Sequence, residues 1–336
     1  MWLLNACTWE LKEFITDKQA PPYAILSHTW RDGEVMFREW QKEPWEIVER
    51  KEGFAKINSC CQQAVADGLE WVWVDTCCID KRSSAELSEA INSMYQWYKS
   101  AEVCYAYIDD VSDHIESNLA NCRWVTRGWT LQELIAPREV VFYSKDWRFL
   151  STRSELSANL AAVTGVQKRF LVGRSLSSAS IAQRMSWAAK RTATREEDSA
   201  YCLLGIFDVN MPLLYGEGSK AFGRLQEILV REYPYDHSLF AWGKIVGQPS
   251  NLVDREPWPT YNPDEVAKPF YGLLANSPAD FRDCGKIVRD TTADNLWRPA
   301  AVSTLVGSIA HVELPTVTTR YKMALHYQNA PIGEWV

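Results

Sequence analysis

The chain has 336 residues, of which 46% are hydrophobic and 24% are charged, and its formal net charge is −7. This composition is typical of a folded globular protein that is long enough for two or three packed units. The acidic balance argues against a polyanion-binding surface over the whole molecule, so nucleic acid is not expected as a partner. A local basic pocket is still compatible with this net charge.

The N-terminal segment and the hydrophobic runs indicate where the chain resides. Residues 1–10 lack the basic start and apolar core of a secretory signal, and no later run reaches the ~18 apolar residues needed to span a bilayer. Nine cysteines include the pairs Cys60-Cys61 and Cys77-Cys78 but no CxxC pair, which indicates reduced, buried thiols. We therefore expect a soluble, cytoplasmic protein with no membrane span.

The first 150 residues alternate between strand and helix patterns. Strands are predicted where short runs rich in β-formers lead into polar loops, at residues 22–27, 69–75, 102–108 and 139–144. Helices are predicted between them from apolar periodicity and boundary residues, at 54–65 before Gly68, at 87–98 after the capping pair Ser83 and Glu86, and at 129–136 before Pro137. This order implies an α/β fold, a mostly parallel sheet with helices on both faces.

The pattern changes beyond residue 150. Residues 151–235 are predicted to form a helical extension packed on the 1–150 sheet domain, with a capping box at Thr194 and Glu197 and an amphipathic stripe over 221–229. Residues 236–336 are proline-rich and then β-like, with candidate strands at 301–306 and 321–327. The chain ends without an obvious terminal cap, which is compatible with a longer native protein.

Several ordered motifs resemble the heterokaryon-incompatibility (HET) domain family of fungal cell-death modules. They cover Leu3–Asn5, Leu11–Phe14, Tyr23–Trp30, Glu34–Phe37, Trp73–Asp80, Ala90–Tyr95 and Arg127–Pro137. The stretches 193–207 and 211–218 look like the segment that commonly follows the domain in this family, which extends the resemblance to about residue 232. The family implies a role in nonself recognition and programmed cell death.

HET domains are in turn remotely similar to Toll/interleukin-1 receptor (TIR) domains, which have a flavodoxin-like sheet. Ile25-Leu26-Ser27 followed by Arg31 looks like the TIR first strand and loop, and residues 129–134 look like the TIR Trp-Cys-x-x-Glu-Leu helix. Thr130 stands where TIR enzymes usually carry cysteine, and Glu133 keeps the carboxylate in register. The resemblance implies a flavodoxin/TIR-like fold for residues 1–150.

Catalytic TIR domains cleave the bond between nicotinamide and ribose in NAD, and the resemblance implies that Glu133 performs this chemistry. A carboxylate beside the ribose stabilises an oxocarbenium-like transition state and orients the attacking water. Trp129 is four residues earlier, so the two side chains are expected to project together, with the indole available to stack on a substrate ring. NAD is then a substrate and not a cofactor. The alternative for Glu133 is an ordinary solvated helix carboxylate.

The remaining candidate residues follow the two strand ends or precede the Glu133 helix. The expected substrate-binding set is Ser27, His28, Trp30, Arg31, Asp75, Asp80, Arg127 and Trp129. Arg31 and Arg127 can bind a pyrophosphate, or each can pair with a neighbouring acid. Asp75 can hold a ribose hydroxyl or cap its loop, and His28 can carry a proton or brace its loop.

Three other chemistries fit the sequence less well. A cysteine hydrolase pairing Cys77 or Cys78 with His28 lacks a nucleophile signature, and a zinc site from the same residues lacks ligand spacing, so no metal is expected. A Rossmann cofactor site requires a glycine-rich turn, which Ser27–Arg31 lacks.

Two functional hypotheses remain open. In the first, an unknown upstream activator brings copies of the chain together as a homo-oligomer, which hydrolyses NAD or a related nucleotide. In the second, the domain is a non-enzymatic adaptor that triggers death by oligomerisation and recruitment.

Overall fold

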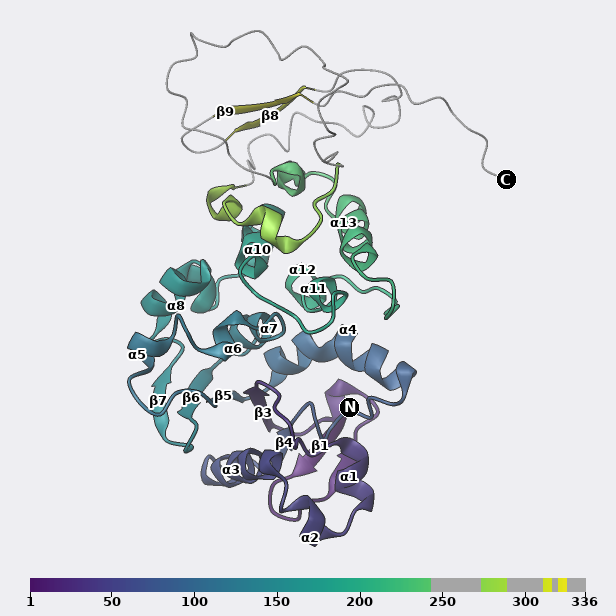
Figure 1. Ribbon diagram of the computed structural model, residues 1–336, viewed down its shortest axis with the longest axis vertical. Coiled ribbons are helices and arrows are strands. Elements are labelled where there is room, and N and C mark those ends of the chain that lie inside the picture. Colours follow the sequence, from purple (N-terminus) through teal and green to yellow (C-terminus); the bar gives the residue numbers. More distant parts are fainter. Residues whose placement is uncertain (243–272, 289–310, 316–319, 325–336) are drawn as a thin grey trace, which may run out of the picture.

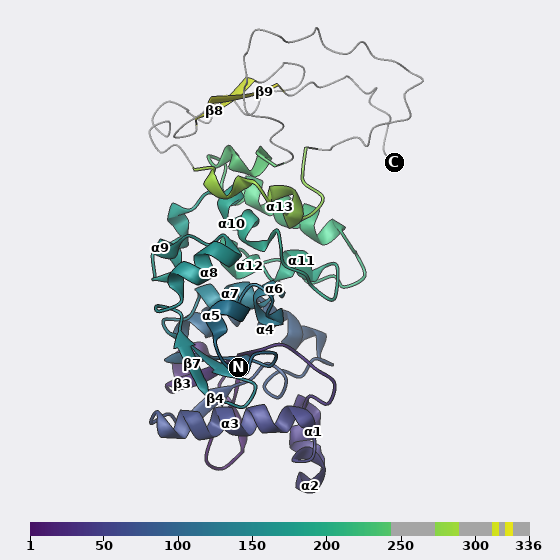
Figure 2. The same ribbon diagram turned by 60° about the vertical axis from the view of Figure 1, so that its left-hand side comes forward.

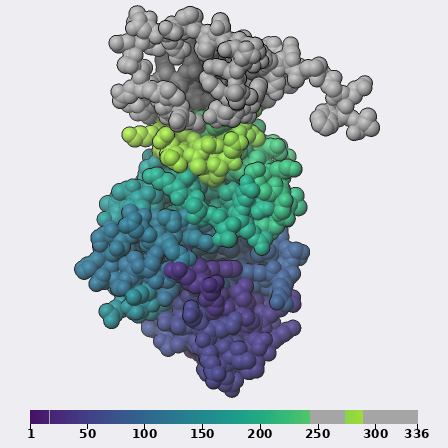
Figure 3. Space-filling model, in the orientation of Figure 1, coloured from purple at the N-terminus to yellow at the C-terminus, as the bar shows by residue number. Residues whose placement is uncertain are grey.

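The computed structural model describes residues 1–242, 273–288, 311–315 and 320–324. A sheet with its flanking helices occupies one end of the molecule, and a group of shorter helices stacks on it (Figure 1). Figure 3 shows the same two parts in close contact.

Seven strands form one mixed sheet in the order β2-β1-β4-β3-β5-β6-β7. The central strands β4, β3, β5 and β6 are parallel, while β2 and β1 on one side and β7 on the other pair antiparallel. In chain order the parallel strands run 2-1-3-4, the arrangement with which flavodoxin-like sheets begin. The strands are β1 Trp2–Asn5, β2 Leu11–Glu13, β3 Tyr23–His28, β4 Trp71–Trp73, β5 Val103–Ile108, β6 Val140–Ser144 and β7 Phe149–Thr152.

Helices cover both faces of this sheet. Figures 1 and 2 place α3 on one face and α4 and α7 on the other. This follows from right-handed crossovers, because the chain moves in opposite directions across the sheet from β3 to β4 and from β4 to β5. The helices of this part are α1 Phe37–Lys42, α2 Trp45–Val48, α3 Glu52–Ala66, α4 Ser84–Ser100, α5 Ile115–Asn118, α6 Arg123–Thr126 and α7 Thr130–Ile135.

The predicted α/β class and its main elements are confirmed. All four predicted strands and all three predicted helices of the first 150 residues are present, Gly68 has the positive φ of a helix stop, and Ser83 Oγ caps α4 by accepting from the Glu86 amide. The short antiparallel strands β1, β2 and β7 were not predicted from the sequence. β7 spans the predicted boundary at residue 150, so the sheet part continues to Thr152.

The helical extension continues from the sheet and stacks on the face that carries α4 and α7 (Figure 2). Its helices are α8 Ser157–Thr164, α9 Lys168–Leu171, α10 Ile181–Ala188, α11 Asp198–Tyr201, α12 Leu204–Phe207 and α13 Lys220–Glu232. The predicted amphipathic stripe is confirmed in α13. The capping box is wrong: α11 begins at Asp198 without a side-chain cap, and the Glu197 carboxylate instead accepts from the amides of Gly216 and Gly218.

Residues 273–288 pack on the helical extension. The sequence pattern had instead assigned them to the separate region 236–336. Gln226 of α13 exchanges two hydrogen bonds with the Ala275 backbone, at 2.9 Å each, and Ser180 Oγ donates to the Ile287 carbonyl. Further along, β8 His311–Pro315 and β9 Arg320–Ala324 form an antiparallel hairpin. β9 overlaps the predicted strand at 321–327, whereas the one at 301–306 lies outside the described residues.

Eight of the nine cysteines are buried, Cys7 is exposed, and all are free thiols, as predicted. Within the described ranges, no helix combines the length and apolar character that crossing a bilayer requires.

Candidate active site

Two parallel strands bring polar side chains to one edge of the sheet. β3 ends in Ser27 and His28, and Asp75 comes two residues after β4. Ile25 pairs with Trp73 in parallel register, so both strands present these residues at the same carboxyl edge, where open α/β sheets place their sites. α7 packs beside β3 and contributes Glu133.

Glu133 is enclosed by side chains from three other elements. Its Oε2 accepts a hydrogen bond from the Ser27 hydroxyl, and it lies beside the Tyr98 hydroxyl of α4, which donates to the Leu26 carbonyl at 3.0 Å. Ser27 Oγ in turn accepts from the Trp124 indole N–H at 2.7 Å. Every residue of α7 is buried, and Glu133 is 6% exposed. The alternative of a solvated helix carboxylate is therefore wrong.

Burial raises the pKa of Glu133 from 4.5 to about 8. The hydrogen bond from Ser27, the interaction with the Tyr98 hydroxyl and the charge of Arg127 act in the opposite direction but are outweighed, and the nearby charge of Asp75 adds to the rise. Glu133 is consequently mostly protonated at neutral pH. In this form it can donate a proton, but it cannot stabilise a developing positive charge as a carboxylate does.

Asp75 joins the loop after β3 to the loop after β4. One carboxylate oxygen lies 2.9 Å from His28 Nε2, and the other accepts from the Trp30 indole N–H at 2.8 Å and lies 3.5 Å from Lys81 Nζ. Burial alone would raise the pKa of Asp75, but the Lys81 ammonium and the bonds from His28 and Trp30 hold it well below its usual range. Asp75 is therefore the ionised carboxylate of this edge.

A buried ion pair lies behind this network. Glu34 Oε1 is 2.5 Å from Lys56 Nζ, accepts from the Arg31 amide, and is 4.0 Å from His28 Nδ1. Lys81 also lies over the Trp30 ring, 3.5 Å from its centroid. His28 thus stands between two carboxylates, and its ring is fixed by the bond to Asp75.

The structure brings together five of the nine predicted residues: Ser27, His28, Trp30, Asp75 and Glu133. The other four contact different partners. Arg31 Nε lies 2.5 Å from Asp109, Asp80 pairs with Arg38, Arg127 donates to Thr194, and the Trp129 side chain hydrogen-bonds Asp198.

Trp129 and Glu133 therefore have separate partners despite their spacing of four residues. Trp129 bonds to α11 of the extension, whereas Glu133 bonds to β3 and lies beside α4. For Arg31 the alternative of pairing with a neighbouring acid is the observed one.

Four residues at this edge were missed by the sequence analysis: Lys56, Lys81, Tyr98 and Trp124. Tyr98 was assigned to the apolar stripe of its helix, whose spacing does not reveal that the hydroxyl reaches Glu133. Lys81 follows the predicted Asp80, so the charged loop after β4 was the only signal for it.

The Cys77 thiol near this edge is not an activated nucleophile. Cys77 is fully buried, and burial raises its pKa well above the usual range, so the sulfur stays protonated. This observation disfavours the cysteine-hydrolase interpretation.

Comparison with protein families places part of the site in a known domain. The family described as Heterokaryon incompatibility protein (HET) matches residues 23–117, and a Domain of unknown function (DUF8212) matches residues 220–310. The first span contains the β3 and β4 loops with His28 and Asp75 and ends before Glu133.

A curated relative supports the same assignment. The chain is 48% identical over 217 residues to the protein named Vegetative incompatibility protein HET-E-1 of Podospora anserina. The match covers 62% of this chain but 16% of that relative. Comparison with solved structures gives no match. By its motifs, its family match and this relative, the chain contains a HET domain.

Proposed function

We propose that this chain triggers cell death in fungal vegetative incompatibility, and that it does so by hydrolysing NAD at Glu133 after self-association. The coarser part rests on the HET family match and on the incompatibility protein that the chain resembles. The finer part rests on one observation: a buried carboxyl group of raised pKa, Glu133, is hydrogen-bonded to the carboxyl end of a central parallel strand.

The proposed reaction breaks the bond between nicotinamide nitrogen and ribose C1′. The nitrogen takes the bonding electrons and leaves as neutral nicotinamide, while positive charge develops on the ribose. Ionised Glu133 stabilises that charge, and water adds at C1′ and loses its proton to the carboxylate or to solvent. The products are nicotinamide, ADP-ribose and one proton.

Glu133 must ionise before it can act in this way. Burial is the main cause of its raised pKa, so admitting water to the site lowers the pKa toward the ordinary value. We propose that an upstream activator and assembly with further copies of the chain produce this opening. The described conformation, with Glu133 covered by Ser27, Tyr98 and Trp124, is then the inactive one.

The second candidate function is a non-enzymatic adaptor that kills by oligomerisation and recruitment. The enclosure of Glu133 favours it, since the residue is 6% exposed and lines neither the large cavity beside Tyr95 and Arg184 nor the small one beside Gly128. In this case Glu133 is a buried structural group that links α7 to β3.

Expression in a fungal host, with viability and cellular NAD scored together, distinguishes the two functions. Glu133→Gln is nearly isosteric with the protonated carboxyl group and should preserve the fold. Glu139→Gln, an exposed position just after α7, is the matched control. We expect the wild type and Glu139→Gln to deplete NAD and kill, and Glu133→Gln to do neither. Killing by the wild type without loss of NAD would refute the enzymatic proposal and support the adaptor.

A further inference from the structure

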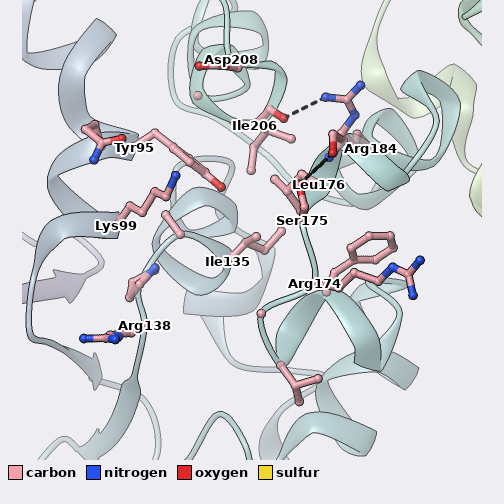
Figure 4. A pocket seen from close by; sticks show the side chains of 18 of the residues that line it. Tyr95, Lys99, Ile135, Arg138, Arg174, Ser175, Leu176, Arg184, Ile206 and Asp208 are labelled. Carbon is pink, nitrogen blue, oxygen red and sulfur yellow. Dashed lines mark hydrogen bonds between the residues drawn. The ribbon is translucent and has the colours of Figure 1, made fainter.

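A cavity of about 940 Å³ lies between the sheet part and the helical extension. One wall is formed by the C-terminal half of α4 and the end of α7, and the other by the segment after α9 together with α10 and α12. Figure 4 shows Tyr95 and Lys99 reaching from the first wall toward Ser175 and Leu176 on the second. This volume is in the range of sites that bind small organic molecules.

The cavity is basic although the chain as a whole is acidic. Its lining includes five cationic side chains, namely Lys99, Arg138, Arg153, Arg174 and Arg184. In the part of the chain that the structure describes, none of the five forms an ion pair with a carboxylate. Clustered cations without counter-charges attract an anionic ligand.

The acidic side chains of the lining do not cancel this charge. They are Glu102, Asp208 and Asp236, three against five. Asp236 is already engaged, because its carboxylate accepts from the Ile181 amide at the start of α10 and from both the amide and the hydroxyl of Ser238. The cavity therefore keeps a net positive charge in a chain whose formal net charge is −7.

Two of the five cations are buried and have unused donors. Arg153 and Arg184 are 5% and 4% exposed. Arg153 Nη1 donates to the Leu134 carbonyl at 2.7 Å, and Arg184 Nη1 donates to the Ile206 carbonyl at 3.2 Å. Nε of both residues is buried without a hydrogen-bond partner in the described structure. A buried guanidinium with an unmade hydrogen bond is costly, and an anion in the cavity can provide the acceptor.

The rest of the lining suits a ligand that also has an uncharged body. Ile135, Pro137 and Leu176 supply apolar surface, and the hydroxyl groups of Tyr95 and Ser175 supply neutral hydrogen bonds. Lys99 and Arg174, on opposite walls, are exposed and can adjust to a phosphate.

We propose that this cavity binds a phosphorylated small molecule of nucleotide size. Its phosphate groups pair with Lys99, Arg138 and Arg174, and its apolar body lies against the wall around Leu176. Such a ligand touches both parts of the molecule and links the extension to the helices α4 and α7. The site is separate from Glu133, which does not line the cavity.

Isothermal titration calorimetry of the full chain with ADP tests the proposal. Adenosine and inorganic pyrophosphate serve as comparison ligands, because each lacks one half of the proposed chemistry. The test variant is Lys99→Gln with Arg174→Gln, both at exposed positions, and the matched control is Arg148→Gln, an exposed arginine outside the cavity. Thermal unfolding of each variant verifies that it is folded.

We expect ADP to bind at one site, more tightly than pyrophosphate, with no binding of adenosine. The double variant should weaken ADP binding by about 10-fold or more, the loss expected from removing charge-assisted hydrogen bonds. Arg148→Gln and Glu133→Gln should bind like the wild type, so the result is independent of the proposed NAD chemistry. No binding of ADP, equal affinity for pyrophosphate, or an unchanged double variant would overturn the proposal.

Discussion

The Ser27 hydroxyl donates a hydrogen bond to the Glu133 carboxyl group and so connects residues that are 106 positions apart in the chain. Ser27 is the last but one residue of the central strand β3, in which residues 23–26 are almost fully buried, and Glu133 lies in the wholly buried helix α7. A rigid strand and a packed helix therefore determine where the carboxyl group lies. This hydrogen bond therefore fixes the position of the Glu133 carboxyl group relative to the sheet.

Ser27→Ala should destabilise the protein by about 1–3 kcal/mol, because it leaves two buried partners unsatisfied. Glu133 loses a donor and the Trp124 indole N–H loses its acceptor. Urea denaturation measures the change in unfolding free energy, and Ser112→Ala at an exposed position is the control. Equal stability of the two variants would show that the Ser27 contacts contribute nothing to folding.

The stability of the protein should fall as the pH rises, because of Glu133. Its pKa is about 8 in the folded state against an ordinary value near 4.5, so the folded state holds the proton more tightly than the unfolded state. The stability from this group is fully present below about pH 4.5 and is lost as the pH rises through about 8.

Glu133→Gln removes that titration. The variant should gain a few kcal/mol relative to the wild type between about pH 5 and pH 8, since each pKa unit corresponds to about 1.4 kcal/mol. Urea denaturation at several pH values measures the difference, and a difference that is constant with pH would contradict the raised pKa.

The sequence was sufficient for the parallel core of the fold and for part of the site. The strands β3 to β6 have strong local patterns, and polar residues at their carboxyl ends meet because parallel strands share one edge. This reasoning placed Ser27, His28 and Asp75 together. β1 and β2 were not predicted because strands of only three or four residues have too little pattern of their own.

The remaining features depend on contacts between distant segments. The Trp124 bond to Ser27 comes from the four-residue helix α6, which was not predicted, and the Tyr98 hydroxyl beside Glu133 comes from a helix whose sequence shows only apolar spacing. The capping box at Thr194 failed because Glu197 has a stronger alternative, the two amides of a glycine loop some 20 residues later. Local motifs do not reveal which of several donors a carboxylate will meet.

Asp75 and Lys81 should be energetically coupled by about 1–2 kcal/mol, above the value for an exposed ion pair. Their side chains are 21% and 19% exposed, and Lys81 also stacks on Trp30. A double-mutant cycle with Asp75→Asn and Lys81→Gln measures the coupling in unfolding free energy. Because the pKa of Asp75 is depressed, its contribution is present above the ordinary aspartate pKa and is lost as the pH falls below it.

The pair of Arg38 and Asp80 provides the matched cycle, since Arg38 is 45% exposed and the ion-pair distance is 3.0 Å. Its coupling should stay below about 1 kcal/mol and should weaken with salt. If both cycles give the same coupling, the partial burial of Asp75 and Lys81 does not strengthen their pair.

Gly205→Ala should separate the helical extension from the sheet part. A Cβ at residue 205 would lie 2.0 Å from the Cβ of Tyr95, so α12 and α4 cannot keep their present contact. We expect a loss of more than about 3 kcal/mol, the upper range for overpacking. The control is Gly223→Ala in α13, where an added methyl group meets nothing within 4 Å and should stabilise the helix by up to about 1 kcal/mol.

The unfolding free energy and the rate of limited proteolysis are measured for Gly205→Ala and for its control, Gly223→Ala. Since the clash involves the Tyr95 Cβ itself, Tyr95→Gly should relieve part of the effect of Gly205→Ala, whereas Tyr95→Ala should not. Rescue by both substitutions would mean that the aromatic ring, and not the backbone approach, limits the contact. Because α4 also carries Tyr98, loosening this contact should expose Glu133, and the pKa of Glu133 should then move from about 8 toward its ordinary value.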